Sequence, residues 1–298
     1  MNLNRYEIFL KVAEIGNITK AADILHYSQA GISHAIAALE KETGVALFLR
    51  SSNGVTLTES GKKLLNPIQA LVNEQNNLSQ TIYELNNVIA GTLRVGTFTS
   101  VSVHWLPEII RRFQETYPQA KFELIAGDYD EIKEGIRSGK LDCGFLTASV
   151  EKNLAFFPLY DDPMMALLAS SHPLAEKESI SLAELVKEPF ILPTKGSDDD
   201  ILSVLGKYRP SVRVAYTLND DFSVIAMVAK GYGVTIMPEL IYKYLNIDIV
   251  PRPLVPMTYR TIGIAALPMN QINPLTKAFI RFLTQDRAIF YENVLARG

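Results

Sequence analysis

Apolar residues in the first forty positions recur at helical spacings and predict three short helices. The first, Leu3–Ile15, ends at the turn signal Gly16-Asn17. A second helix is predicted to start with Thr19 as its cap, and a third to follow the capping residue Ser28. Two short helices with a tight joint are typical of a helix-turn-helix, whose second helix enters the DNA major groove. An ordinary helical hairpin would show a similar pattern.

A β-hairpin is predicted directly after these helices. The β-prone runs Leu47–Leu49 and Val55–Leu57 flank Ser52-Asn53-Gly54, and Asn-Gly between two such runs is a strong hairpin signal. A hairpin in this place corresponds to the wing of a winged helix. Arg50, with Ser51 and Ser52 on this wing, is predicted to face DNA phosphates, and a solvated surface arginine is the simpler alternative for Arg50.

From Thr58 to Ile89, apolar side chains alternate at spacings of four and three. This pattern is a heptad repeat over more than three heptads, and one helix cannot bury so narrow a stripe alone. We therefore predict a coiled coil between two copies of the chain, with a core helix of a bundle as the alternative. Pro67 predicts a kink or a helix start near Asn66. The predicted dimerisation positions are Leu64, Ile68, Leu71, Gln75, Leu78, Ile82, Leu85 and Ile89.

After Ala90-Gly91, β-prone and helical runs alternate to the end of the chain. Leu93–Phe98 and Asp142–Thr147 are among the predicted strands, and Met164–Ala169 starts a second set. A closing amphipathic helix is predicted over Asn273–Phe290. This alternation predicts parallel strands with helices on both faces, in two α/β units. With no complete motif for chemistry in either unit, the pattern indicates a bilobed binding module.

Hydroxyl side chains follow predicted strands at three places in this region: Thr99-Ser100, Thr147 and the run Pro193–Ser197. Open α/β sheets bind ligands beyond the carboxyl ends of their strands, and helix starts there favour an anion such as a carboxylate. Each hydroxyl alone is more simply explained as a cap or turn residue. Three at equivalent places predict a shared cleft, although Asp198, Asp199 and Asp200 are unfavourable neighbours for an anion.

Composition narrows the class of protein. The chain has 298 residues, enough for two or three domains, and its 48% hydrophobic and 20% charged residues are typical of a soluble globular protein. No signal peptide and no membrane span are expected, so the predicted location is cytoplasmic. The single cysteine, Cys143, rules out an internal disulfide. It is predicted to be a buried structural thiol because it lies in the apolar run Leu141–Leu146, and a redox-sensing role is unsupported because no second cysteine could resolve an oxidised one.

Charge bears on whether the chain binds nucleic acid, and sequence motifs bear on whether it is an enzyme. The net charge of −3, with seven Lys or Arg against six Asp or Glu through Leu65, argues mildly against nucleic acid binding. Helix N-termini and hydroxyls can supply phosphate contacts instead. The sequence lacks a Walker loop, GxGxxG, GxSxG and HExxH, and its four histidines have no metal-ligand spacing. We therefore expect a binding protein rather than an enzyme, with no metal and no cofactor.

The order of these parts resembles the LysR-type transcriptional regulators along essentially the whole chain. Gly31 stands where alanine is usual in the family, which predicts a weaker, more flexible recognition helix. Gly139–Asp142 with Gly144, and Gly231–Val234 running to Pro238, resemble the family's effector-domain landmarks. The residues that carry the resemblance at the N-terminus are Ala21-Ala22, Leu25, Ser28-Gln29, Ile32-Ser33, Ile36, Leu39-Glu40, Gly44, Leu47-Phe48, Arg50, Thr56-Leu57-Thr58 and Gly61.

The resemblance implies an N-terminal all-α winged helix-turn-helix over residues 1–58 and a linker (dimerisation) helix over 59–90. It implies a periplasmic-binding-protein-like α/β effector domain over 91–298, with subdomain I at about 91–162 and 266–298 and subdomain II at about 163–265. Family members are homodimers or homotetramers that bind double-stranded promoter DNA. They alter transcription when a small molecule, here expected to be anionic, enters the cleft between the subdomains, and RNA polymerase is a further candidate partner.

Residue by residue, the resemblance assigns DNA contacts to the recognition helix and the wing, and effector contacts to the strand ends. The alternative is a cytoplasmic solute-binding module whose N-terminal helices only mediate dimerisation. The implied DNA-binding residues are Gln29, Ala30, Ser33 and His34 at bases, with Ser28, Arg50 and Ser51 at phosphates. The implied effector-binding residues are Thr99, Ser100, Val101, Thr147 and Ser197.

Overall fold

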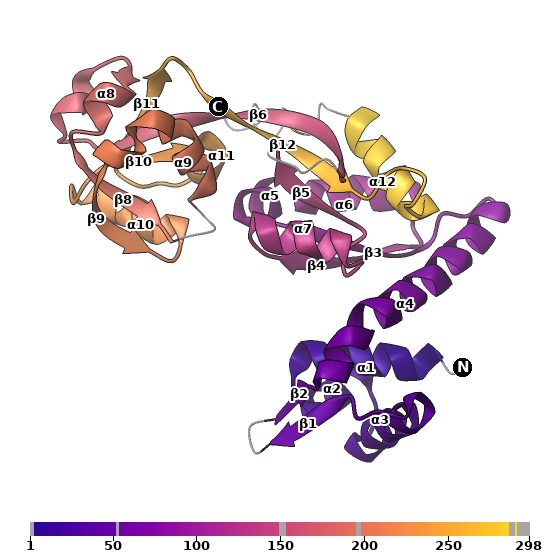
Figure 1. Cartoon of the computed structure of the whole chain (residues 1–298). Helices are drawn as coiled ribbons and strands as arrows, with labels where there is room; N and C mark the ends of the chain where they lie inside the picture. The colour runs from indigo at the N-terminus through magenta and orange to yellow at the C-terminus, as the bar shows by residue number, and fades with distance from the viewer. Residues whose placement is uncertain (1–2, 52–53, 149–152, 195–197, 286–289, 291–298) are drawn as a thin grey trace. The chain divides into compact units, whose positions relative to one another are not determined.

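The computed structural model describes residues 3–51, 54–148, 153–194, 198–285 and 290, and these divide into two compact units (Figure 1). One unit contains residues 1–91 with 137–140, and the other contains the remainder. The first unit is built from α1 (Leu3–Ile15), α2 (Ile18–Leu25), α3 (Gln29–Thr43), β1 (Phe48–Ser51), β2 (Gly54–Leu57) and α4 (Glu59–Leu85). Its core includes the fully buried side chains of Phe9, Val12, Ile32, Leu39 and Leu47.

The sequence predicted the cap of α3 correctly and the cap of α2 incorrectly. Asn17, not Thr19, caps α2: its side chain accepts a hydrogen bond from the Lys20 amide at 3.0 Å, so the helix begins at Ile18. The predicted Thr19 cap is wrong because an equally good capping side chain stands two residues earlier. Ser28 caps α3 as predicted, with its Oγ accepting from the Gly31 amide at 3.0 Å.

The predicted hairpin is confirmed as the antiparallel pair β1–β2, and Ser52 and Asn53 of its turn lie outside the described residues. Helix α3 fixes the start of this hairpin. Glu40 Oε1 on α3 accepts hydrogen bonds from the backbone amides of Leu47 at 2.8 Å and Phe48 at 3.3 Å. The wing is therefore tied to the recognition helix by a side chain whose role the sequence did not indicate.

Helix α4 starts at Glu59 and continues through Pro67, so the predicted alternative start near Asn66 is wrong. Thr58 caps it, with its hydroxyl accepting from the Gly61 amide at 2.9 Å. A Cβ atom at Gly61 would lie 2.3 Å from the Leu47 carbonyl oxygen, so glycine permits the helix to pack closely on the wing. The helix ends at Leu85.

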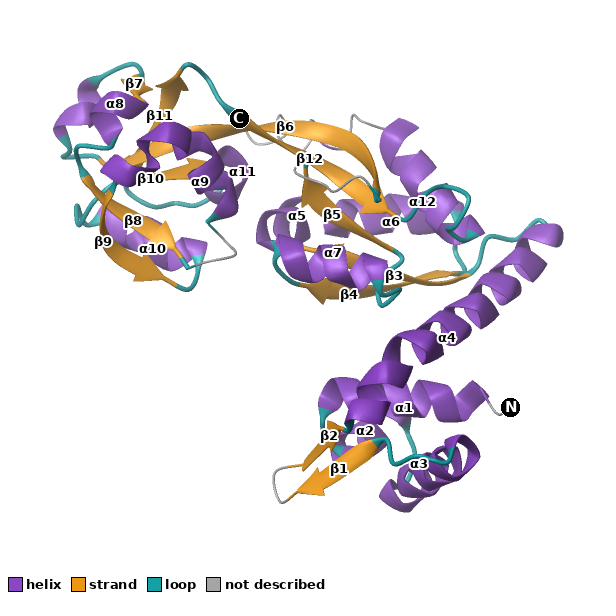
Figure 2. Cartoon of the chain, viewed as in Figure 1, coloured by secondary structure: helices purple, strands orange, loops and turns teal. Residues whose placement is uncertain are grey.

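The second unit contains a long mixed sheet and a smaller parallel pair (Figure 2). In the described residues, the long sheet has the order β4-β3-β5-β12-β6-β11-β7, and β10 also pairs with β6. Its strands are β3 (Gly91–Thr97), β4 (Ala120–Ala126), β5 (Cys143–Thr147), β6 (Ala155–Ala169), β7 (Ile180–Ser181), β10 (Thr235–Pro238), β11 (Ile249–Val255) and β12 (Tyr259–Ala266). The smaller pair is β8 (Pro189–Pro193) with β9 (Arg213–Leu218).

The prediction of parallel strands holds only in part. Strand β3 is parallel to β5, and β8 to β9, but β12 is antiparallel to both β5 and β6. Strand β6 has 15 residues and pairs with β12 along most of its length, so these two strands run side by side from one lobe of the unit to the other (Figure 2). The sequence indicated only the second half of β6, because Pro158, Asp161 and Pro163 interrupt its apolar pattern.

Helices pack on both lobes. One lobe buries Ile132, Ile136 and Leu146 beside β5, and the other buries Met164, Phe190 and other side chains around β8 and β10. The helices are α5 (Thr99–His104), α6 (Leu106–Thr116), α7 (Tyr129–Arg137), α8 (Leu182–Leu185), α9 (Asp199–Leu205), α10 (Asp221–Ala229), α11 (Glu239–Tyr242) and α12 (Pro274–Gln285), with 3-10 turns at Pro173–Glu176 and Gly206–Ser211. Among the helices described, none has the length and apolar content that crossing a membrane would require.

Candidate functional site

Helix α3 is anchored by one face and exposes the other. Ile32, Ile36 and Leu39 are buried in the core of the first unit. The residues that the sequence assigned to base contacts lie elsewhere on the helix: Gln29, Ala30 and His34 are exposed, and Ser33 is half-buried. The start of α3 therefore exposes polar side chains on a helix whose other face is buried.

The wing carries a cation, Arg50, at its surface. Arg50 is exposed on β1 and has no carboxylate partner among the described residues. The Ser51 hydroxyl is also exposed, but it donates to the Gly54 carbonyl oxygen at 3.2 Å within the hairpin. Arg50 is thus free to contact an anion outside the unit.

The predicted dimerisation positions separate into two groups. Ile68 is buried and Leu64 half-buried in the core of the first unit, so these positions serve the unit's own packing. Leu71, Leu78, Ile82 and Leu85 are 36–79% exposed on the later turns of α4. Gln75 lies within the second group, between Leu71 and Leu78, and its side-chain oxygen is buried without a hydrogen-bond partner among the described residues. Ile89 lies beyond the helix end, because Asn87 adopts the left-handed conformation at φ 57° and ends the helical pattern.

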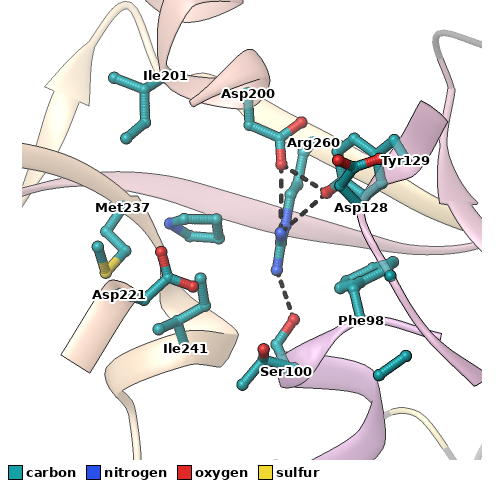
Figure 3. Close-up of a pocket in the computed structure, with 14 residues that line it drawn as sticks. Phe98, Ser100, Asp128, Tyr129, Asp200, Ile201, Asp221, Met237, Ile241 and Arg260 are labelled. Atoms are coloured by element: carbon teal, nitrogen blue, oxygen red, sulfur yellow. Dashed lines mark hydrogen bonds and ion pairs between the residues drawn. The ribbon is translucent and has the colours of Figure 1, made fainter. Parts of the chain in front are cut away.

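A cavity of about 360 Å³ lies in the second unit, where segments of both lobes meet (Figure 3). Phe98, the start of α5 and the start of α7 line it from one lobe. The other lobe contributes the starts of α9 and α10 with residues around β10 and α11. Arg260 of β12 reaches the cavity from the strand that runs between the lobes.

Arg260 is the centre of a buried polar network (Figure 3). Its Nε and Nη2 donate to Asp162 Oδ2 at 2.9 and 2.8 Å, and Nη2 also donates to Ser100 Oγ at 2.9 Å. Its Nη1 donates to Asp200 Oδ2 at 3.2 Å and to the Tyr129 hydroxyl at 3.3 Å, and that hydroxyl donates to Asp200 at 2.7 Å. The network joins five segments that are far apart in the sequence: α5, α7, β6, α9 and β12.

The network fixes the charge state of its members. Burial alone would lower the pKa of Arg260, but Tyr129, Asp162 and Asp200 outweigh burial and raise it, so the guanidinium stays charged. Burial raises the pKa of Asp162, and Arg260 opposes that effect. Burial also raises the pKa of Tyr129, which keeps its hydroxyl protonated as a donor to Asp200.

The structure brings together some of the residues predicted for the effector cleft. Thr99 and Ser100 line the cavity. Thr147 lines a neighbouring cavity of about 350 Å³, and the two cavities share Tyr129, Asp200 and Arg260. Val101 is fully buried and lines neither cavity, and Ser197 lies outside the described residues.

Sequence reasoning missed the central residues of the cavity: Tyr129, Asp221 and Arg260. The one available signal was a charged residue at the start of an apolar strand, since Arg260 precedes the run Thr261–Ala266. Its partner Asp162 is 98 positions away, so no local pattern could pair them. Cys143 is buried as predicted, and burial raises the pKa of its thiol.

Comparisons with known proteins assign both parts of the chain. A family model described as "Bacterial regulatory helix-turn-helix protein, lysR family" matches residues 3–62, and one described as "LysR substrate binding domain" matches residues 86–288. YvbU of Bacillus subtilis (strain 168), an uncharacterized HTH-type transcriptional regulator, is 29% identical over 283 residues, covering 94% of this chain and 97% of the relative. OxyR of Escherichia coli (strain K12), a DNA-binding transcriptional dual regulator, is 29% identical over 275 residues and 90% of each chain.

Solved structures share the fold over the same length. Full-length OxyR from Pseudomonas aeruginosa aligns with a TM-score of 0.72 at 24% identity, covering 96% of this chain and 97% of that one. Full-length CbnR in complex with its target DNA aligns with a TM-score of 0.68 at 21% identity, covering 96% and 99%. The chain thus belongs to the LysR family of bacterial regulatory helix-turn-helix proteins, and it is a DNA-binding transcriptional regulator with an effector-binding domain.

Proposed function

We propose that this regulator recognises a dyad-symmetric promoter site through α3 and the wing of two copies, and that a small molecule in the Arg260 cavity controls it. The observation that carries the proposal is the exposed polar start of α3 on a firmly buried helix face. A helix in the major groove meets base edges with its N-terminal residues.

The base-reading residues of this proposal are Gln29, Ala30, Ser33 and His34. A glutamine can form two hydrogen bonds to adenine, and serine can bond to either kind of base. A small residue such as Ala30 allows close approach to a thymine methyl group. The four lie in the first two turns of a helix that starts at Gln29, as major-groove reading requires.

Phosphate contacts fall to Arg50, with Ser28 and Ser51 as weaker partners. Arg50 is exposed and has no carboxylate partner within the described residues, so binding a phosphate breaks no existing ion pair. Phosphate contacts set the register of the protein on the duplex and make the affinity depend on salt.

The proposed location of this DNA-binding regulator is the cytoplasm, where the chromosomal DNA of a bacterium lies.

A second copy of the chain is proposed to cover the exposed apolar positions of α4. Leu71, Leu78, Ile82 and Leu85 recur at spacings of seven, four and three on one helix face. Because Leu64 and Ile68 are used inside the unit, the proposed contact is confined to the later turns of α4. Residues 59–90 thus act as the linker between a DNA-binding domain of residues 1–58 and an effector domain of residues 91–298. Pairs of dimers, and contact with RNA polymerase, remain part of the proposal.

Control by the cavity is proposed to work through Arg260 and Asp200. Asp200 belongs to α9 in the proposed subdomain II, whereas Ser100 and Tyr129 belong to subdomain I. A ligand that shifts the hydrogen bonds of Asp200 to Tyr129 and Arg260 would change the contacts between the two lobes. The chain is proposed to act by binding rather than catalysis, because the polar groups at the centre of the cavity are engaged with one another.

The test is selection of binding sites from random duplex DNA by the full-length chain, followed by footprinting upstream of the chain's own gene cluster. We expect an enriched dyad-symmetric site and protection of a matching promoter sequence. A double variant, Gln29→Ala with His34→Ala, serves as the control and should enrich no sequence. Failure of the parent chain to enrich any site would contradict the proposal and favour a solute-binding module whose N-terminal helices only dimerise.

A further inference from the structure

We propose that the effector of the Arg260 cavity carries a positively charged group, an ammonium or guanidinium, on an aliphatic chain. The inference rests on the proposed function, because it names the ligand class of the same cavity. It differs from the anionic ligand that the hydroxyl clusters indicated. Four observations support it. The N–H groups of Arg260 are already hydrogen-bonded, and the other charges that line the cavity are negative. Asp221 has no hydrogen-bond partner among the described residues, and one wall of the cavity is apolar.

Arg260 has no donor left for an anion. A guanidinium has five N–H groups, and those of Arg260 make five hydrogen bonds. Two carboxylates, Asp162 and Asp200, also balance its charge. An anionic ligand would have to displace Asp200 and would release a carboxylate beside itself. The cation that lines the cavity is therefore not available as an anion receptor.

The remaining charges at the cavity are negative. Asp128, Asp200 and Asp221 line it together with Arg260, while Lys133 lines only the neighbouring cavity. Asp128 caps α7 with one oxygen, since its Oδ1 accepts from the Glu131 amide at 2.8 Å. Only Oδ2 of Asp200 is engaged by Arg260 and Tyr129. These carboxylates would repel an anion and attract a cation.

Asp221 is the carboxylate best placed for a ligand. It lies in the first turn of α10, faces the cavity beside Met237 and Ile241, and makes no hydrogen bond with any described residue (Figure 3). Burial raises its pKa, which is the sign of a carboxylate without enough compensation for lost hydration. An ammonium or guanidinium at this position would supply the missing partner.

The rest of the cavity suits a short aliphatic chain. Ile201, Met237 and Ile241 give it an apolar wall, and the rings of Phe98 and Tyr129 meet edge to face at 5.2 Å. Its volume of about 360 Å³ lies in the range of small-molecule sites. A four- or five-carbon amine would place methylenes on this wall and its charged ends at Asp221 and a second carboxylate.

The test measures thermal stability and calorimetric binding of the full-length chain with matched probes. The amines are putrescine, cadaverine and agmatine, and the controls are succinate and butanediol, which share the four-carbon chain of putrescine, all at one ionic strength. A ligand that binds only the folded chain raises its melting temperature. We expect stabilisation by at least one amine and by neither control. Stabilisation by succinate alone, or by none of the amines, would overturn the inference.

Two variants locate the site. Asp221→Asn should weaken amine binding at least tenfold. Asp128→Asn should weaken it less, because one oxygen of Asp128 is already occupied as the cap of α7. Asparagine can still cap α7, so this variant should fold. Asp130→Asn is the matched control: it removes the same charge from an exposed side chain outside the cavity and should leave amine affinity unchanged. Equal affinity in the parent, Asp221→Asn and Asp128→Asn chains would overturn the assignment, even if an amine binds.

DNA binding, measured in parallel without amine, separates this inference from the proposed function. A parent chain that binds its selected duplex but responds to none of the amines retains the proposed function and loses only the cationic ligand. A parent chain that selects no duplex loses the proposed function itself.

Discussion

The Arg260–Asp162 pair shows how much a single buried contact can matter. Both groups are almost fully buried, and Asp162 also accepts a hydrogen bond from the Leu240 amide at 3.0 Å. Removing one member of a buried ion pair costs about 3–5 kcal/mol, and Asp200 would then be the one carboxylate left to Arg260 among the described residues. We therefore expect Asp162→Ala to lower the free energy of unfolding by that amount in urea titrations.

Ser100→Ala is the matched comparison for this prediction. Ser100 is a neutral partner of the same guanidinium, and a hydrogen bond to a charged group contributes about 1.5–3 kcal/mol. Equal losses in the two variants would contradict the role assigned to the Asp162 charge.

Asp221 gives a prediction with the opposite sign. Burial raises its pKa, Arg260 opposes that effect, and Asp220 and Asp200 add to the rise. The folded chain then holds a proton more tightly than the unfolded chain, so stability falls as the pH rises through the raised pKa. We expect Asp221→Asn to raise the melting temperature of the ligand-free chain at pH 7. The gain should vanish as the pH falls below the ordinary pKa of aspartate, 3.8, because both states are protonated there. A constant difference across a pH series would contradict this account.

At the scale of elements, helix α4 shows what a spacing pattern can and cannot determine. The repeat correctly indicated which side chains share a face, because helical geometry fixes that locally. It could not indicate what each would touch. Leu64 and Ile68 pack into the unit's own core because the hairpin folds back on the start of α4, and Thr58 accordingly donates its amide to Leu47 O at 2.9 Å. The helix end also escaped prediction, since the apolar Val88 and Ile89 follow the left-handed Asn87 and continue the spacing of the repeat.

The two parts of α4 should respond differently to substitution. Leu78→Glu places a charge on the exposed apolar stripe and should convert dimers to monomers in analytical ultracentrifugation. Asn76→Glu adds the same charge on the opposite face and should leave the dimer intact. Ile68→Ala should instead lower the stability of the first unit by about 2–5 kcal/mol, because its side chain is buried there. Dimers that survive Leu78→Glu would exclude this stripe as the contact between copies.

At the scale of the whole molecule, the sequence predicted two α/β lobes but not how the chain passes between them. Periodicity identifies a strand without its direction, so alternating elements favoured parallel pairing. The antiparallel strands β6 and β12 reverse that expectation, and they bring Asp162 and Arg260 together at the cavity. The hydroxyls at strand ends, Thr99 and Ser100, were predictable because strand ends are local features. Of the acidic lining, the sequence placed only Asp200 near the cleft, because it follows the run Pro193–Ser197, whereas Asp128 and Asp221 join it only through the tertiary fold.

The charge of the whole molecule shapes how it can hold DNA. A net charge of −3 and a nearly neutral N-terminal part leave few cations for phosphates, so affinity must come from two copies acting together.

If each copy places one Arg50 on a phosphate, Arg50→Ala should weaken binding to every duplex and reduce the salt slope of a dimer by about two. Gln29→Ala should instead lose about 1–3 kcal/mol of discrimination at one base position per half-site, with the salt slope unchanged. Fluorescence anisotropy with selected and scrambled duplexes across a salt series distinguishes the two. Affinity unchanged in both variants would remove α3 and the wing from the DNA interface, because these residues supply its proposed specificity and its free cation.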